Sequence, residues 1–229
     1  MQTPGRFVRF DLMTTAPAEA RAFYAGLFGW TFEQAAGDFA PTMHADGAPV
    51  GWLMPMEPGH PSHWIGYVSV ADTDAACARV VEAGGQVCVP PMDLPIGRFA
   101  VVEDATGAVT SPLAGGASEA PACLAWVQLL TRDAEAAAPL YAAVDGWDAA
   151  ALEGAAHVFA VEGEPFASIM QKPGGPEEER DAWLPYFKVA SVAERTAAAR
   201  ALGGRVFVPP TPLPGMGRFA VLADPTGAT

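Results

Sequence analysis

The chain repeats a long segment of its own sequence. The stretch VPPMDLPIGRFAVVEDATGA at residues 89–108 returns as VPPTPLPGMGRFAVLADPTGA at residues 208–228. Val89 and Val208 are 119 positions apart, whereas Gly97 and Gly217 are 120 apart, so one residue was gained in the turn between them. Because this period is near half of the 229 residues, it predicts two similar domains, each long enough to hold its own core.

The two copies are predicted to meet at a segment of small residues. The sequence AGGASEAP at residues 114–121 has no apolar periodicity and is typical of a linker. We therefore expect a first domain at residues 1–114, a linker at residues 115–121 and a second domain at residues 122–229. Thr229 aligns with Val109, so the second copy is expected to lack most of its last strand, through loss of that strand or because the sequence is incomplete. An exposed sheet edge would follow.

The charge of the chain excludes several classes of partner. Lys and Arg number 13 against 26 Asp and Glu, which gives a formal net charge of −13. Such a surface repels phosphate backbones and anionic headgroups, so we expect no nucleic-acid and no membrane partner. The sequence contains no apolar run of the roughly 18 residues that a membrane span needs, and its first nine residues do not resemble a leader. We expect a cytoplasmic protein.

The three cysteines give no sign of a disulfide framework or a zinc site. Cys77, Cys88 and Cys123 are widely spaced and form no Cys-x-x-Cys pair. We expect all three to be reduced residues of the core.

The first unit of the sequence has the pattern β-α-β-β-β. Residues 7–12 alternate, with Arg9 and Asp11 on the polar face. A helix is expected from about Pro17 until Gly29 ends it. Short strands should follow at residues 31–34, 41–45 and 50–55, with Asp46-Gly47 as a hairpin turn.

The same order recurs through the rest of the chain. The second unit is predicted to have strands at residues 64–70, 86–89, 99–103 and 109–113, and a helix at residues 74–83 with Cys77, Val80 and Val81 inward. The third is predicted to have strands at residues 124–130, 158–161 and 166–170, and a helix at residues 134–144. Pro139 should kink that helix or delay its start. The fourth begins with a strand at residues 183–189, and Ser191 and Glu194 form a capping box for its helix.

Four β-α-β-β-β units, with FYAGLFGW at residues 23–30 and GRFAVVEDATGA at residues 97–108, resemble the vicinal oxygen chelate superfamily. This superfamily includes glyoxalase I, the bleomycin-resistance proteins and the extradiol dioxygenases. The repeated VPP and GRFAV elements are most similar to the tandem glyoxalase-like antigens of actinobacteria. The resemblance implies an α+β fold of tandem βαβββ units, in which each half forms a strongly curved paired sheet with helices outside and a ligand cup inside.

The resemblance also locates the positions at which metal-dependent members carry His or Glu. Arg9 and Trp126 occupy these positions in the first strands of the two halves, and Ser111 stands where a Glu is found in a closing strand. The corresponding positions of the second and fourth units hold Ile65 and Leu184. Divalent metals of this family need several converging imidazole or carboxylate donors. We therefore expect no metal and no other cofactor.

The positions that face the cup differ between the two halves. The first half presents the charged pair Arg9 and Asp11, which could anchor a polar ligand or simply close the cup mouth as a salt bridge. The second half presents the indole of Trp126 and the amide of Gln128, which suit an aromatic ligand. Lys188 would attract an anionic group. The residues predicted to bind a ligand are Arg9, Asp11, Tyr67, Trp126, Gln128, Tyr186 and Lys188.

Other polar residues carry no predicted chemistry. His44 and His157 do not occupy equivalent positions of the repeat, and we interpret them as incidental. Asp104 and Asp224 do recur, which favours a scaffold role because both copies must build the same turns. We assign no catalytic residue from the sequence.

Three hypotheses for the function follow. The first is a metal-free small-molecule-binding protein of the glyoxalase/bleomycin-resistance type that sequesters or carries an aromatic or polar metabolite. The second is a glyoxalase-like lyase or dioxygenase, and the third is a non-catalytic structural or partner-binding module. Fold-level resemblance does not choose among them. The tandem halves are compatible with a monomer that contains an internal pseudo-dimer and with a homodimer.

Overall fold

The computed structural model has the α+β fold with curved sheets that the sequence predicted. It describes residues 4–34, 39–116, 119–145, 147–152, 155–172 and 181–229. The elements of the first half are β1 (Phe7–Thr14), α1 (Pro17–Phe28), β2 (Thr31–Glu33), β3 (Thr42–Ala45), β4 (Ala48–Pro55), β5 (His63–Ser69), α2 (Thr73–Glu82), β6 (Gln86–Leu94), β7 (Gly97–Glu103) and β8 (Val109–Ala114). Those of the second half are β9 (Leu124–Thr131), α3 (Ala134–Asp145), β10 (Asp148–Leu152), β11 (Ala155–Val161), β12 (Glu164–Gln171), β13 (Ala182–Phe187), α4 (Val192–Ala201), β14 (Arg205–Leu213) and β15 (Gly217–Ala223).

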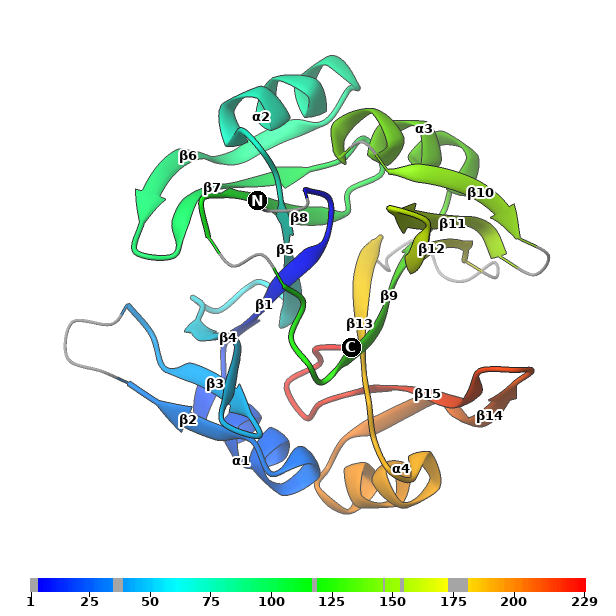
Figure 1. Ribbon diagram of the computed structural model, residues 1–229. Helices are drawn as coiled ribbons and strands as arrows, with labels where there is room; N and C mark the ends of the chain where they lie inside the picture. Colours follow the sequence, from blue (N-terminus) through cyan, green and yellow to red (C-terminus); the bar gives the residue numbers. More distant parts are fainter. Residues whose placement is uncertain (1–3, 35–38, 117–118, 146, 153–154, 173–180) are drawn as a thin grey trace. The chain divides into compact units, whose positions relative to one another are not determined.

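In the described part of the chain the strands form three hydrogen-bonded sheets (Figure 1). The first sheet has the order β2-β3-β4-β1-β5-β8-β7-β6, the second has the order β10-β11-β12-β9-β13, and β14 pairs with β15. In each of the first three β-α-β-β-β units the first strand lies parallel to the last, as β1 does to β4, β5 to β8 and β9 to β12. The order of pairing therefore repeats as the sequence does.

The folded chain divides into two compact bodies. They are distinct from the four β-α-β-β-β units of the sequence, and from here on they are called the first and the second unit. The first unit comprises Met1–Arg9 and Ile65–Phe187, and the second comprises Phe10–Trp64 and Lys188–Thr229. These units differ in their bounds from the sequence copies, and the division into domains at residues 114 and 122 stays a prediction.

Both units contain the same aromatic core. In the first unit Tyr141 of α3 stacks on Trp147 with ring centroids 5.6 Å apart and meets the edge of Trp183 at 5.0 Å. The counterparts in the second unit are Tyr24, Trp30 and Trp64. There the stacked rings are 5.6 Å apart and the edge contact spans 5.4 Å. The recurrence of these residues in the sequence therefore reflects a shared packing requirement.

Local turn signals in the sequence were accurate. Gly29 ends α1 in the left-handed region at φ 73°, where a side chain would be strained. Asp46 and Gly47 both have positive φ between β3 and β4, as the predicted hairpin turn requires. Asp133 Oδ1 accepts a hydrogen bond from the Ala136 N–H, so α3 begins at Ala134 and Pro139 does not delay its start.

Three predictions were wrong about exposure. Val81 was expected to face inward, but it is 55 % exposed because the buried side of α2 is formed by Ala76, Cys77 and Val80. Cys88 was expected in the core, but it is exposed on β6, at the edge of the first sheet. Cys123 was also expected in the core, but it is only half-buried. All three cysteines are free thiols.

Two strand assignments also needed correction. β6 continues to Leu94, well beyond the predicted end at Val89, and its register with β7 shifts between Val89 and Met92. The two prolines in between can be accommodated at this irregularity in an edge strand. His157 was expected to precede a strand, but it lies within β11.

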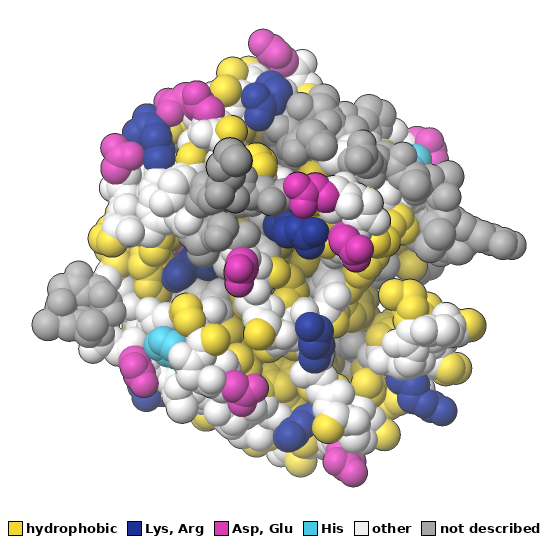
Figure 2. Space-filling view, in the orientation of Figure 1, with side chains coloured by type: hydrophobic (Ala, Val, Ile, Leu, Met, Phe, Trp, Pro, Cys, Tyr) yellow, Lys and Arg dark blue, Asp and Glu magenta, His cyan; other side chains and the backbone are white. Residues whose placement is uncertain are grey.

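The described helices are all too short or too polar to cross a bilayer. Figure 2 shows Lys and Arg side chains scattered among acidic ones over the visible face, without a basic patch there.

We expect the amides of Phe219–Ala223 in β15 to exchange with solvent faster than those of Phe99–Glu103 in β7. Strand β7 lies between β6 and β8, whereas β15 pairs with β14 alone among the described strands. The side chain of Phe99 is buried, but its counterpart Phe219 is only half-buried. Hydrogen exchange followed by mass spectrometry measures the difference. Equal protection of the two strands would show that something else covers the edge of β15.

Candidate functional site

Strand β9 positions a set of side chains on the side of the second sheet opposite α3. Leu129 and Ile169 are fully buried, and the indole of Trp183 contacts Tyr141 of α3, so these alternate residues face the helix. Ser168 pairs with Gln128, and Tyr186 pairs with Trp126. Their side chains therefore share the opposite side of the sheet. We call the four residues Trp126, Gln128, Ser168 and Tyr186 the polar face.

A chain of hydrogen bonds connects the polar face. The Trp126 indole Nε1–H donates to Ser168 Oγ at 2.9 Å, and Gln128 Nε2 donates to the same oxygen at 3.3 Å. The Tyr186 hydroxyl donates to Gln128 Oε1 at 2.9 Å. The network orients the indole ring and leaves its aromatic faces out of the hydrogen bonding. All four side chains are neutral at physiological pH.

Burial raises the pKa of Tyr186 to about 12. The phenol is protonated at neutral pH, as an ordinary tyrosine is, and the raised pKa lets it remain a hydrogen-bond donor to Gln128 at alkaline pH as well. In the second unit, burial and the carboxylate of Asp224 raise the pKa of Tyr24 well above its ordinary value.

We expect Tyr24 and Tyr186 to ionise at higher pH than ordinary tyrosines, with a cost in stability at alkaline pH. Their pKa values are higher in the folded state than in the unfolded state, so their contribution to stability is complete below about pH 10 and is lost as the pH rises through the folded values. Ultraviolet absorbance of tyrosinate follows the ionisation. Tyr186→Phe should remove one of the increases in absorbance that occur above the ordinary tyrosine pKa. Ionisation of all four tyrosines together at about pH 10 in folded protein would contradict this assignment.

The residues predicted for the first half have different surroundings. Tyr67 is 5 % exposed, its ring lies 6.2 Å from that of Phe99, and the Arg9 guanidinium lies 5.9 Å from its centroid. Asp11 is 1 % exposed, and its Oδ1 accepts a hydrogen bond from the Trp52 backbone N–H at 2.7 Å. Arg9 and Tyr67 belong to the first unit and Asp11 to the second. A joint role of Arg9 and Asp11 in anchoring a ligand stays a prediction.

Lys188 was expected to act with Trp126 on an anionic ligand. It is exposed and belongs to the second unit, whereas Trp126 belongs to the first. Their joint action therefore stays a prediction. The structure does bring together Trp126, Gln128 and Tyr186, and it adds Ser168, which the sequence did not single out.

The positions at which the family resemblance implies metal ligands do not offer a suitable donor set. Trp126 uses its only N–H on Ser168, and Ser111 donates its hydroxyl to the Ala100 carbonyl at 2.6 Å. Nowhere in the described part of the chain do three or more His, Cys, Asp or Glu side chains gather closely enough to hold a metal ion. These residues do not fit the imidazole and carboxylate ligands that divalent transition metals require.

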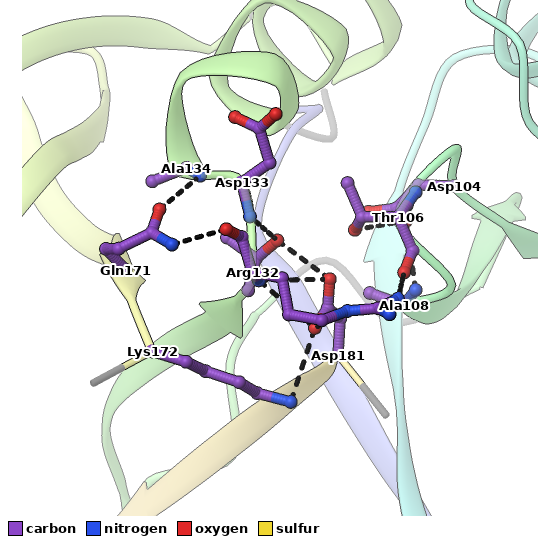
Figure 3. Close-up of polar contacts among 10 residues, drawn as sticks. Asp104, Thr106, Ala108, Arg132, Asp133, Ala134, Gln171, Lys172 and Asp181 are labelled. Atoms are coloured by element: carbon purple, nitrogen blue, oxygen red, sulfur yellow. Dashed lines mark hydrogen bonds and ion pairs between the residues drawn. The ribbon is translucent and has the colours of Figure 1, made fainter. Parts of the chain in front are cut away.

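Asp104 has the contacts of a scaffold residue (Figure 3). Its Oδ1 accepts from the backbone N–H and the hydroxyl of Thr106 at 2.8 and 2.7 Å and from the Ala108 N–H at 2.9 Å. Its Oδ2 accepts a hydrogen bond from the buried Tyr141 hydroxyl at 2.6 Å. The Tyr141 hydroxyl oxygen in turn accepts one from the Trp183 indole N–H at 2.9 Å. One carboxylate thus organises a turn and also satisfies a buried phenol.

A second buried carboxylate lies beside this turn, in the same unit (Figure 3). Asp181 accepts from Thr131 Oγ1 at 2.9 Å, from Arg132 Nε at 3.3 Å and from Lys172 Nζ at 3.2 Å. Burial alone would raise the pKa of Asp181, but the hydrogen bonds from Thr131, Arg132 and Lys172 outweigh it, so the pKa is lowered. Ser62 occupies the equivalent position of the first copy. The sequence repeat therefore gave no signal for this cluster.

Comparison with known proteins agrees with this architecture. Residues 6–110 match the model of the Glyoxalase/Bleomycin resistance protein/Dioxygenase superfamily. CFP32 of Mycobacterium bovis, whose name includes the word glyoxylase, is 33% identical over 239 residues, covering 95% of this chain and 90% of that protein. The anthracycline biosynthesis protein DnrV of Streptomyces peucetius is 34% identical over 254 residues, covering 98% of this chain and 91% of that protein.

Solved structures show the same fold at lower sequence identity. The Mn(II)-bound glyoxalase from Novosphingobium aromaticivorans has a TM-score of 0.68 at 16% identity, with all of this chain and 81% of that one covered. The 2,3-dioxygenase LapB from Pseudomonas sp. KL28 has a TM-score of 0.66 at 12% identity, with all of this chain and 91% of that one covered. Given the match of residues 6–110 and the relatives above 30% identity, the chain belongs to the Glyoxalase/Bleomycin resistance protein/Dioxygenase superfamily.

Proposed function

We propose that this protein binds an aromatic small molecule at the polar face without a metal ion, so as to sequester or carry it. The observation that carries the proposal is the hydrogen bond from Trp126 Nε1 to Ser168 Oγ, which holds a half-buried indole ring in place on the side of the sheet opposite α3. An indole whose edge is fixed can stack against a planar ligand at little entropic cost.

The chemistry of the polar face favours an uncharged aromatic ligand. Its side chains offer an aromatic ring, an amide and two hydroxyls, with no ionised group among them to oppose burial of apolar surface. The name of the Streptomyces relative DnrV points in the same direction, since anthracyclines are polycyclic aromatic compounds.

A lyase or dioxygenase function is the second candidate. It is favoured by the name of CFP32 and by the fold shared with glyoxalases and dioxygenases. The side chains of this chain argue against a metal-dependent enzyme. Trp126 and Ser111 stand at positions where the family resemblance implies metal ligands, and they cannot replace His or Glu. We therefore derive no metal-dependent step.

Protein purified without a histidine tag is expected to contain clearly less than one transition-metal ion per chain and to carry an aromatic compound. Elemental analysis after dialysis measures the first quantity, and mass spectrometry of the denatured extract measures the second. Retention of about one Zn, Ni, Fe or Mn ion per half would contradict the metal-free proposal and favour the lyase or dioxygenase.

A further inference from the structure

We infer that Ser168 selects the ligand of the polar face by donating its hydroxyl proton to a carbonyl-type oxygen on the aromatic compound. The inference rests on the proposed binding of an aromatic ligand there, and it narrows the ligand class to aromatic ketones, quinones and related acceptors.

The hydrogen bonds of Ser168 leave its proton available. A serine hydroxyl has two lone pairs and one proton. The lone pairs accept from Trp126 Nε1 and from Gln128 Nε2. No residue in the described part of the chain accepts the remaining proton from Ser168. Since the side chain is only 4 % exposed, bulk water is a poor substitute partner. Buried donors normally find an acceptor, so a ligand oxygen would complete the set.

The polar face fixes the orientation of the Gln128 amide beside this hydroxyl. The Tyr186 hydroxyl donates to Gln128 Oε1, which turns the amide so that Nε2 faces Ser168. The Tyr186 hydroxyl is protonated at neutral pH, as a tyrosine ordinarily is. Each hydrogen bond polarises the next one, and the series ends at the Ser168 proton.

The first copy of the repeat shows that the fold itself does not require this hydroxyl. The strand registers pair Leu12 with Leu53 and Leu129 with Ile169, so Trp52 is the counterpart of Ser168 and Asp11 is that of Gln128. Trp52 has an indole where Ser168 has its hydroxyl. Asp11 presents acceptor oxygens, and its Oδ1 accepts a hydrogen bond from the Trp52 backbone N–H. The hydroxyl of Ser168 is therefore particular to the second copy.

A pair of isosteric probes tests the inference. 2-Acetylnaphthalene has a carbonyl oxygen where 2-isopropenylnaphthalene has a methylene group, and the two are otherwise alike. Calorimetric titration should show that the wild-type protein prefers the ketone. Ser168→Ala should weaken ketone binding by about 10-fold, the scale of one hydrogen bond, and change alkene binding by less than about 2-fold.

Two variants and one control separate this role from a merely structural one. Ser168→Thr keeps a hydroxyl and should keep the preference for the ketone. Gln128→Glu keeps Ser168 but offers its proton a carboxylate acceptor, so the preference should fall although the serine is still present. Ser111→Ala removes a different buried hydroxyl of the same unit and should leave the preference unchanged.

The possible failures are distinguishable. If Trp126→Ala weakens both probes while Ser168→Ala leaves their ratio unchanged, the proposed function stands and the assignment of Ser168 is wrong. A loss of preference in Tyr186→Phe but not in Ser168→Ala would give the selecting proton to Tyr186 and likewise overturn the inference. Failure of both probes to bind the wild-type protein would overturn the inference together with the proposed function.

Discussion

Asp104→Ala is expected to lower the free energy of unfolding by about 3 kcal/mol, because the variant loses several charge-assisted hydrogen bonds at once. The carboxylate accepts three bonds that shape its turn and a fourth from the buried Tyr141 hydroxyl. Without it, the turn amides and the phenol must find other partners inside the protein. Urea denaturation monitored by tryptophan fluorescence measures the change.

The control for this prediction is Asp93→Ala. Asp93 is an exposed carboxylate that pairs with Arg98 at 3.2 Å, and its loss should cost no more than about 0.5 kcal/mol, as is usual for surface ion pairs. A double-mutant cycle of Asp104→Ala with Tyr141→Phe should reveal a coupling energy between the two side chains. A cost below about 1 kcal/mol for Asp104→Ala would mean that the buried contact adds little to stability.

Trp126→Ala is expected to weaken binding of 2-acetylnaphthalene by about 1 to 3 kcal/mol, or roughly 5- to 150-fold, the usual scale for loss of a buried aromatic anchor. The matched control is Arg9→Ala, which alters the equivalent position of the first copy and should change the affinity by less than about 2-fold. Calorimetric titration of both variants compares them directly. A loss confined to Arg9→Ala would place the ligand in the first half, and no loss in either would favour a structural module.

The sequence predicted the fold well where the signals are local. Gly29 and the Asp46-Gly47 turn specify backbone conformations that few other residues adopt, so the ends of α1 and β3 followed from residue type alone. Positions that depend on neighbours were harder. Val81 has the right residue type for a core position, but its exposure is set by the helix face that packs on the sheet.

The candidate site could be predicted only in part. Trp126, Gln128 and Tyr186 were identifiable because they lie on the polar register of two recognisable strands. Ser168 was not, since its counterpart Trp52 differs and a serine in a strand has no distinctive pattern. The recurrence of Asp104 and Asp224 indicated a scaffold role, but the hydrogen bond from Tyr141 to Asp104 is a tertiary contact between residues 37 positions apart. Spacing alone cannot reveal such a contact.

Titration of chelator-treated protein with 2-acetylnaphthalene tests most directly whether an aromatic ligand binds at the polar face without a metal. The proposed function predicts the same affinity before and after removal of divalent metals, together with the loss in Trp126→Ala. Binding that disappears on chelation and returns when Mn, Fe, Ni or Zn is restored would contradict it.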